Sequence, residues 1–118
     1  MSEFGAGGIY GVRELEDNIT WTENYQQEYL EYTLELFIKH LRISGTFIWQ
    51  YCDIRAGVRT NDRGIIRALQ RPRSFNNKGL VNEYRRPKMA YYAVKRLYVN
   101  DCEDRFRENI YKYGGIFE

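Results

Sequence analysis

Residues 44–55 read "SGTFIWQYCDIR", and this stretch decides the fold. Gly45 is its second residue, and positions 46–52 are rich in β-branched and aromatic residues, which is typical of β-strands. The apolar run is nearly continuous instead of alternating, as in a parallel strand that is buried on both faces. Polar residues return at Asp53 and Arg55. We therefore predict a buried parallel strand over residues 46–52.

The preceding residues predict a helix from about Glu23 to Leu41. Thr22 or Thr20 can cap its start, and Thr20 with Glu23 has the spacing of a capping box. Positions at helical spacing form one buried stripe: Gln26, Leu30, Leu34, Phe37 and Leu41. A second stripe beside it widens the expected buried face: Tyr25, Tyr29, Tyr32 and Leu36.

The following residues predict a long loop and a second helix. The loop covers about residues 56–86, is basic and turn-rich, and has "RPRSFNNKG" (71–79) at its centre. Pro87 stands at the favoured first position of the helix. The expected buried stripe of this helix is Met89, Tyr92, Ala93, Arg96 and Leu97.

The N-terminal stretch "SEFGAGGIYG" (2–11) resembles the end of a further strand that runs into a glycine-rich loop. The order is then strand end, helix, strand, loop and helix, a βαβα unit that is typical of parallel α/β sheets and barrels. Two strands and two helices cannot cover both faces of a parallel sheet. We therefore expect a piece of a larger α/β domain.

Composition narrows the classes of function. The 118 residues fit one globular domain, and the net charge of +2 does not favour an acidic partner such as nucleic acid. No apolar run approaches the ~20 residues of a membrane span. Cys52 and Cys102 lie far apart, without CxxC spacing and with His40 as the single histidine. We expect no metal site, reduced thiols and a cytoplasmic location.

Five stretches together carry a resemblance to a known family: "SEFGAGGIYG", "WTENYQ", "SGTFIWQYCDIR", "NNKGLV" and "RRPKMAYYAVKRLY". In this order they resemble the closing part of the catalytic domain of glycoside hydrolase family 2, nearest to its β-glucuronidases. That domain is a (β/α)8 TIM barrel of roughly 250 residues. The resemblance implies a partial barrel: residues 1–98 as the end of strand 7, helix 7, strand 8 and helix 8, and residues 99–118 as a C-terminal tail.

The resemblance also implies a reaction. Members of this family are retaining glycosidases that work by double displacement without metal or cofactor, and here the substrate would be a β-D-glucuronide. Glu3 matches the nucleophile of the family's (S/T)-E-(F/Y)-G pattern, with small residues at positions 5–7 leaving room for a sugar. The family's acid/base glutamate precedes the matched region, and Asn82-Glu83 does not match its motif. We expect the chain alone to be inactive and the parent enzyme to be a homo-oligomer.

Three further residues match substrate-binding positions of the family. Trp49 matches a tryptophan that lines the sugar site, although a tryptophan of the core would fit the sequence as well. Asn76 and Lys78 match the Asn-x-Lys motif of glucuronidases, where a lysine and an amide bind the uronate carboxylate through charge-assisted hydrogen bonds. Asp53 and Arg55 could orient this loop by ion pairing, or belong to the structural rim.

Other functions stay open at this point. A β-galactosidase-like member of the same family would share the fold, but it would gain nothing from the charge of Lys78. A non-catalytic remnant or binding module would keep the fold without the reaction. The loop arginines, Arg59, Arg63, Arg67, Arg71 and Arg73, fit a phosphate-contacting patch. No motif of a nucleic-acid binder accompanies them, so we expect neither nucleic-acid nor membrane partners.

Overall fold

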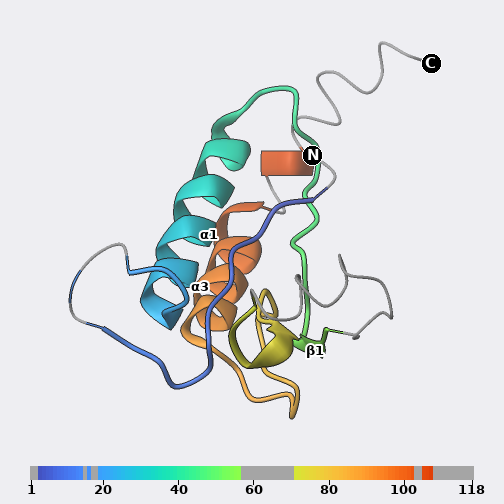
Figure 1. Cartoon of the computed structure of the whole chain (residues 1–118). Helices are drawn as coiled ribbons and strands as arrows, with labels where there is room; N and C mark the ends of the chain where they lie inside the picture. The colour runs from blue at the N-terminus through green and yellow to red at the C-terminus, as the bar shows by residue number, and fades with distance from the viewer. Residues whose placement is uncertain (1–2, 15, 17–18, 57–70, 103–104, 108–118) are drawn as a thin grey trace.

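The computed structural model describes residues 3–14, 16, 19–56, 71–102 and 105–107. The elements in chain order are the helix α1 (Glu23–Lys39), the strand β1 (Ile54–Arg55), the 3-10 turn η1 (Pro72–Ser74), the strand β2 (Phe75–Asn76), the helix α3 (Met89–Leu97) and the π-helical turn η2 (Tyr98–Cys102). α1 and α3 pack against each other, with the extended segments beside them (Figure 1). This mixture of helices and a small sheet is consistent with the predicted α/β class.

The extended segments pair mainly in parallel. Phe4 and Ile48 form a parallel bridge, in which the N–H of Trp49 donates to the carbonyl of Phe4 at 2.8 Å. Cys52 and Val81 form a second parallel bridge. β1 and β2 pair antiparallel. The predicted strand over residues 46–52 is thus present as isolated parallel bridges, followed by the short β1, instead of one continuous strand.

The prediction that this strand is buried on both faces is wrong. Phe47, Trp49 and Tyr51 are 72%, 44% and 60% exposed. The residues between them, Ile48 and Gln50, are half-buried. Side chains of an extended segment point alternately to opposite faces, and within the described residues only one face is packed. The aromatic run is therefore apolar without being buried.

α1 begins at Glu23, as predicted, and ends at Lys39, before the expected Leu41. Thr22 is its N-cap, because the Thr22 Oγ1 accepts a hydrogen bond from the N–H of Tyr25 at 3.1 Å. Thr22 and not Thr20 therefore satisfies the first orphan donors of the helix.

One of the two predicted stripes of α1 is buried. Gln26, Leu30 and Leu34 are fully buried, which confirms the centre of the main stripe. The second stripe is wrong, since its members are largely exposed: Tyr29 37%, Tyr32 68% and Leu36 50%. Leu41, beyond the end of α1, is also 48% exposed. A single neighbouring helix covers only a narrow stripe of α1.

α3 starts later than the sequence indicates. Its N-cap is Lys88, so Pro87 lies ahead of the cap and not at the first helical position. The buried residues are Ala90, Ala93, Val94 and Leu97. The expected Tyr92 is 61% exposed, because the face toward α1 is shifted to the two small alanines, which allow close helix packing.

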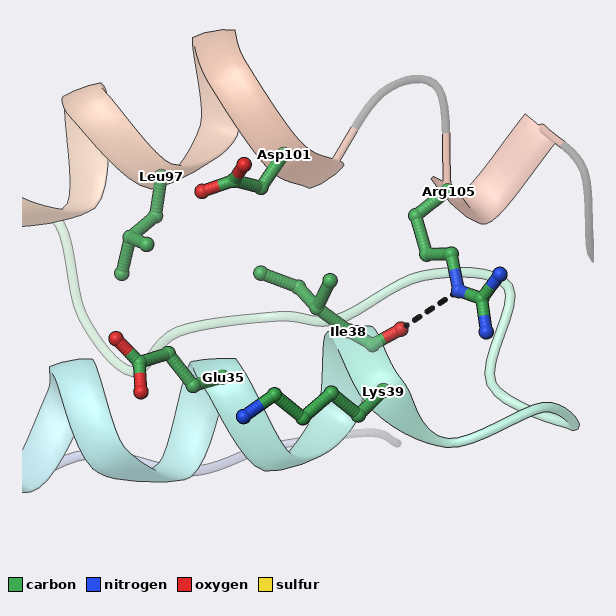
Figure 2. A pocket seen from close by; sticks show the side chains of 6 residues that line it. All are labelled: Glu35, Ile38, Lys39, Leu97, Asp101 and Arg105. Carbon is green, nitrogen blue, oxygen red and sulfur yellow. Dashed lines mark hydrogen bonds between the residues drawn. The ribbon is translucent and has the colours of Figure 1, made fainter.

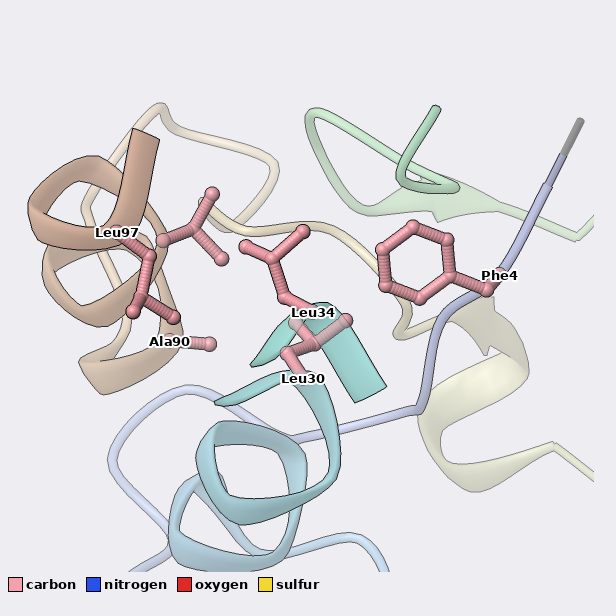
Figure 3. Packing of buried hydrophobic residues seen from close by; sticks show 6 residues of the cluster. Phe4, Leu30, Leu34, Ala90 and Leu97 are labelled. Carbon is pink, nitrogen blue, oxygen red and sulfur yellow. The ribbon is translucent and has the colours of Figure 1, made fainter. Parts of the chain in front are cut away.

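The apolar core lies between α1, α3 and the segment around Phe4. Figure 3 shows Leu30 and Leu34 pointing between Phe4 on one side and Ala90 and Leu97 on the other. Val94 completes this cluster. The Phe4 ring also packs edge-on against Phe37, with centroids 5.0 Å apart. Each buried leucine contributes about 1.5–3 kcal/mol, so this cluster anchors the segment that carries Glu3 to both helices.

None of the helices in the described ranges is long and apolar enough to cross a membrane. The predicted tail, residues 99–118, lies mostly outside the described residues, as do Arg59, Arg63 and Arg67 of the basic loop.

Candidate functional site

Three of the four predicted site residues line one open pocket of about 410 Å³. Glu3 comes from the N-terminal segment, Trp49 from the segment before β1, and Lys78 from the loop after β2. Their side chains offer a carboxylate, an indole and an ammonium group. The rest of the lining is Phe4, Gly5, Tyr29, Thr33 and Phe37. The pocket therefore combines charges of both signs with aromatic walls.

Close backbone approach places Glu3 and Trp49 at the same pocket. A Cβ added at Gly5 would lie 2.0 Å from the carbonyl oxygen of Trp49, so only glycine fits there. A Cβ at Gly7 would lie 2.6 Å from the ring of Trp21. These two glycines make room for protein atoms. The expectation that residues 5–7 also leave room for a sugar stays a prediction, and Gly5 lines the pocket.

The Asn-x-Lys motif forms a compact turn. The Oδ1 of Asn76 accepts a hydrogen bond from the N–H of Lys78 at 3.2 Å, and the Lys78 carbonyl accepts one from the N–H of Gln50 at 3.1 Å. Asn76 does not line the pocket. Its amide oxygen supports the Lys78 backbone, while the Lys78 side chain is exposed at the pocket.

A buried ion pair lies beneath these segments. Lys88 Nζ is 2.8 Å from Asp53 Oδ1, and both side chains are fully buried. Burial raises the pKa of the Asp53 carboxyl, against the opposing effect of the Lys88 ammonium. Burial likewise lowers the pKa of the Lys88 ammonium, against the effect of Asp53. At both groups burial disfavours the charged form, and the attraction between the two charges opposes this effect.

Two more buried polar side chains connect the helices to the loops. The Nε2 of Gln26 donates to the carbonyls of Ala6 and Gly79, at 3.1 and 2.9 Å. Glu23 accepts hydrogen bonds from the N–H groups of Gly11 and Met89, each at 2.8 Å. The N-terminal turns of α1 and α3 are therefore joined by polar contacts.

Several solved structures of glycosidases are similar to this chain. A GH2 β-galacturonidase from Eisenbergiella tayi, bound to galacturonate, is 40% identical, with a TM-score of 0.67 over 92% of this chain and 16% of that chain. A β-glucuronidase from Ruminococcus gnavus is 31% identical, with a TM-score of 0.67 over 86% and 15% of the two chains. One from Faecalibacterium prausnitzii is 25% identical, with a TM-score of 0.65 over 86% and 16%. No protein-family model and no curated protein matches the sequence.

This chain is similar to part of GH2 glycosidases. The likeness supports a glycoside hydrolase of the GH2 family, as the sequence motifs predicted. The chain spans 15–16% of the length of these three structures.

Sequence reasoning missed most of the buried side chains that support this pocket. The sequence patterns do not single out Lys88, and they predict Gln26 only as part of the buried stripe of α1. The sequence left open whether Asp53 and Arg55 orient the loop by ion pairing or belong to the structural rim, and in the structure Asp53 accepts the N–H of Gly79 at 2.9 Å. Its ion-pair partner is Lys88 and not Arg55. The signal available in the sequence was the position of this lysine, between Pro87 and the first residue of the predicted buried stripe, Met89.

A second pocket of about 470 Å³ lies where the C-terminal part of α1 meets the end of α3. Figure 2 shows its six lining residues, Glu35, Ile38, Lys39, Leu97, Asp101 and Arg105. The Nε of Arg105 donates to the Ile38 carbonyl at 3.3 Å. This pocket contains none of the predicted site residues. Across the described ranges, no group of three potential metal ligands forms a metal-binding cluster.

Proposed function

We propose that this chain is part of a retaining GH2 glycosidase that hydrolyses β-D-glucuronides. In this proposal residues 1–98 form the end of strand 7, helix 7, strand 8 and helix 8 of a (β/α)8 barrel, and residues 99–118 form a tail. The observation that carries it is the shared pocket of Glu3, Trp49 and Lys78, three residues from distant parts of the chain. Active sites of such barrels lie where strands end and loops begin.

In the proposed reaction Glu3 is the nucleophile. Its carboxylate oxygen attacks the anomeric carbon and forms a glycosyl-enzyme while the bond to the aglycone oxygen breaks, and water then releases the glucuronate. A second carboxyl group about 5–5.5 Å away has to protonate the leaving oxygen and then activate the water. Among the described residues that line the pocket, Glu3 is the one carboxylate. The acid/base group is therefore assigned to another part of the enzyme.

Substrate binding is assigned to the other residues of the motifs. The Lys78 ammonium would bind the uronate carboxylate through a charge-assisted hydrogen bond, and the Trp49 indole would pack against the pyranose ring. Asn76 supports Lys78 from within the turn. Its own contact with the carboxylate, implied by the motif, requires its side-chain N–H₂ to reach the pocket.

One observation favours a second candidate substrate. The GH2 enzyme that is 40% identical to this chain is a β-galacturonidase bound to galacturonate, whereas the two β-glucuronidases are 31% and 25% identical. Glucuronides and galacturonides share the carboxylate and differ at the 4-hydroxyl group. Lys78 therefore fits both sugars, and the preference depends on contacts to that hydroxyl group.

Covalent labelling tests the nucleophile without an acid catalyst. In 2-deoxy-2-fluoro-β-D-glucuronyl fluoride, fluoride leaves with its bonding pair and needs no proton, while the 2-fluoro group slows release of the adduct. We expect one glucuronyl adduct, located on Glu3 by peptide mass mapping. The matched galacturonyl reagent compares the two candidate sugars. An adduct on another carboxylate, or equal labelling of Glu3→Gln, would remove Glu3 from this role.

The same reagents test Lys78. Lys78→Ala should slow labelling by the glucuronyl reagent about 10- to 150-fold, the equivalent of a charged hydrogen bond of about 1.5–3 kcal/mol. Labelling by the neutral 2-deoxy-2-fluoro-β-D-glucosyl fluoride should change less than about threefold. Lys95→Ala removes an exposed lysine of α3 outside the pocket and is the control. Equal slowing with both reagents would show that the Asn-x-Lys motif has a structural role and does not bind the uronate carboxylate.

A further inference from the structure

Lys88 connects the two segments that carry the charged residues of the pocket. Its buried Nζ donates to the carbonyl of Gly8 at 2.5 Å and to the carbonyl of Asn77 at 3.1 Å. Gly8 ends the segment that begins at Glu3, and Asn77 stands directly before Lys78. One side chain from the start of α3 therefore holds both segments.

The two segments also contact each other at the same point. The N–H of Gly8 donates to the carbonyl of Asn77 at 2.9 Å, so this carbonyl accepts from both Gly8 and Lys88. Asp53 Oδ1 accepts from Lys88 and from the N–H of Gly79, at 2.8 and 2.9 Å. The ammonium group thus lies among one carboxylate and two carbonyls, and each of its three N–H donors has a partner.

The position favours lysine for a chemical reason. An ammonium group has three donors in tetrahedral directions and no acceptor, which matches two carbonyls and a carboxylate around one point. A buried charge is costly unless it is paired and hydrogen-bonded. An apolar side chain could fill the volume, but it would leave the carbonyl of Gly8 without this donor.

We propose that Lys88, neutralised by Asp53, is a positioning residue that sets the separation between Glu3 and Lys78 at the pocket. This inference rests on the proposed function of those two residues. Lys88 touches no substrate, since it is fully buried beneath the loops. It acts through the backbone of Gly8 and Asn77, one at the end of each segment.

Glu23 provides a matched control. Its side chain is also fully buried and also bridges distant segments, through the N–H groups of Gly11 and Met89. It makes no hydrogen bond to residues 3–8 or 76–79 in the described structure. A role in general stability would appear in Glu23→Gln as well as in Lys88 variants. A role in positioning the two segments would appear only in the Lys88 variants.

The test variant is the 118-residue chain with Asp53→Asn and Lys88→Met together. This pair of changes leaves no unpaired buried charge, and the amide oxygen at position 53 can still accept from Gly79. Amide hydrogen exchange is measured at Gly8, which bonds across the two segments, and at Leu34 in the apolar core. We expect exchange at Gly8 to rise at least tenfold while that at Leu34 changes less than threefold, and Glu23→Gln to leave Gly8 within threefold of the unchanged chain.

The second readout is the labelling rate of Glu3. The ratio of glucuronyl to glucosyl labelling should fall at least fivefold in the double variant and stay within twofold in Glu23→Gln. Unchanged exchange at Gly8, equal rises at Gly8 and Leu34, or an unchanged labelling ratio beside faster exchange would each overturn the proposal. If the unchanged chain shows no preference for the glucuronyl reagent, the proposed function fails, and exchange at Gly8 still decides whether Lys88 holds the two segments together.

Discussion

The helix pair is held together differently at its two ends. Toward the middle and C-terminal parts of α1 and α3, leucines, alanines and a valine pack around Phe4. At the N-terminal ends, the contacts are made by buried polar side chains: Glu23, Gln26, Asp53 and Lys88. Residues 76–81, which carry Lys78, are attached at this polar end. Residues 3–8, which carry Glu3, are attached there through Ala6 and Gly8 and at the apolar end through Phe4.

The two kinds of contact differ in how precisely they fix the positions of the segments that they join. Apolar contacts are non-directional, and the energy depends mainly on the area removed from water. Hydrogen bonds to buried carbonyls and carboxylates fix distances and angles within narrow limits. The apolar end therefore supplies packing stability and holds Phe4, and the polar end fixes the loops through directional hydrogen bonds. The predictions below test this division, from the largest expected effect to the smallest.

Lys88→Met alone should be the most damaging change, because it leaves the Asp53 carboxylate buried without its ion-pair partner. We expect the free energy of unfolding, measured by urea denaturation, to fall by about 3–5 kcal/mol. Adding Asp53→Asn should recover most of this loss, since no charge is then left unpaired. Equal stability of the single and double variants would show that the two charges are not coupled.

Leu34→Ala tests the apolar end. Leu34 is fully buried between α1 and α3, and its truncation should cost about 2–5 kcal/mol of unfolding free energy. Phe4, next to Glu3, packs in the same cluster, so we expect the labelling rates with both reagents to fall. The ratio of glucuronyl to glucosyl labelling should stay within twofold, because the polar end still holds the loop that carries Lys78. A large change in that ratio would break the proposed division between the two ends.

Thr22→Ala tests the cap at the polar end of α1. Loss of the hydrogen bond from the N–H of Tyr25 to Thr22 Oγ1 should cost about 1 kcal/mol in thermal or urea unfolding. Thr20→Ala is the matched control, since Thr20 is exposed, and should change stability by less than about 0.5 kcal/mol. A larger loss of stability in Thr20→Ala than in Thr22→Ala would show that Thr20, which has capping-box spacing with Glu23, caps the helix instead.

The ion pair of Arg73 and Glu83 should give the smallest effect. Burial raises the pKa of Glu83, but hydrogen bonds from its own backbone and from Arg73 outweigh this, so its pKa is lowered from the usual 4.5. The unfolded state then binds more protons, and the stabilisation present above pH 4.5 is lost as the pH falls through the folded-state pKa. Since the Arg73 side chain is 40% exposed, Glu83→Gln should remove less than about 1 kcal/mol at pH 7 and almost nothing at pH 2. A larger loss at pH 2 would contradict this sign.

The sequence predicted the apolar end better than the polar end. The spacing of Gln26, Leu30 and Leu34 identified the buried stripe of α1 because helical periodicity is a local property. The burial of Tyr32 and Phe47 was predicted wrongly, because local apolarity does not say whether another segment covers a side chain. Lys88 could not be predicted as buried, since its carboxylate partner lies 35 positions away in the sequence.

The pocket was accessible to sequence reasoning only in part. Glu3, Trp49 and Lys78 were identified through motifs, and the structure brings them to one pocket. Their roles stay predictions. The wall formed by Tyr29, Thr33 and Phe37 was not predicted, because it depends on how α1 lies against the N-terminal segment. The support of Lys78 by Asn76 is a property of a folded turn, which the motif alone does not specify.

The contact at Gly5 constrains how this site can diverge. One added carbon there would collide with the carbonyl of Trp49, so any amino-acid substitution at position 5 would push apart two neighbouring segments at once. In a saturation library selected for folded chains, position 5 should retain glycine nearly alone. The helical wall of Tyr29, Thr33 and Phe37, where side chains can vary without moving the backbone, would then be the part of the pocket most open to substitution.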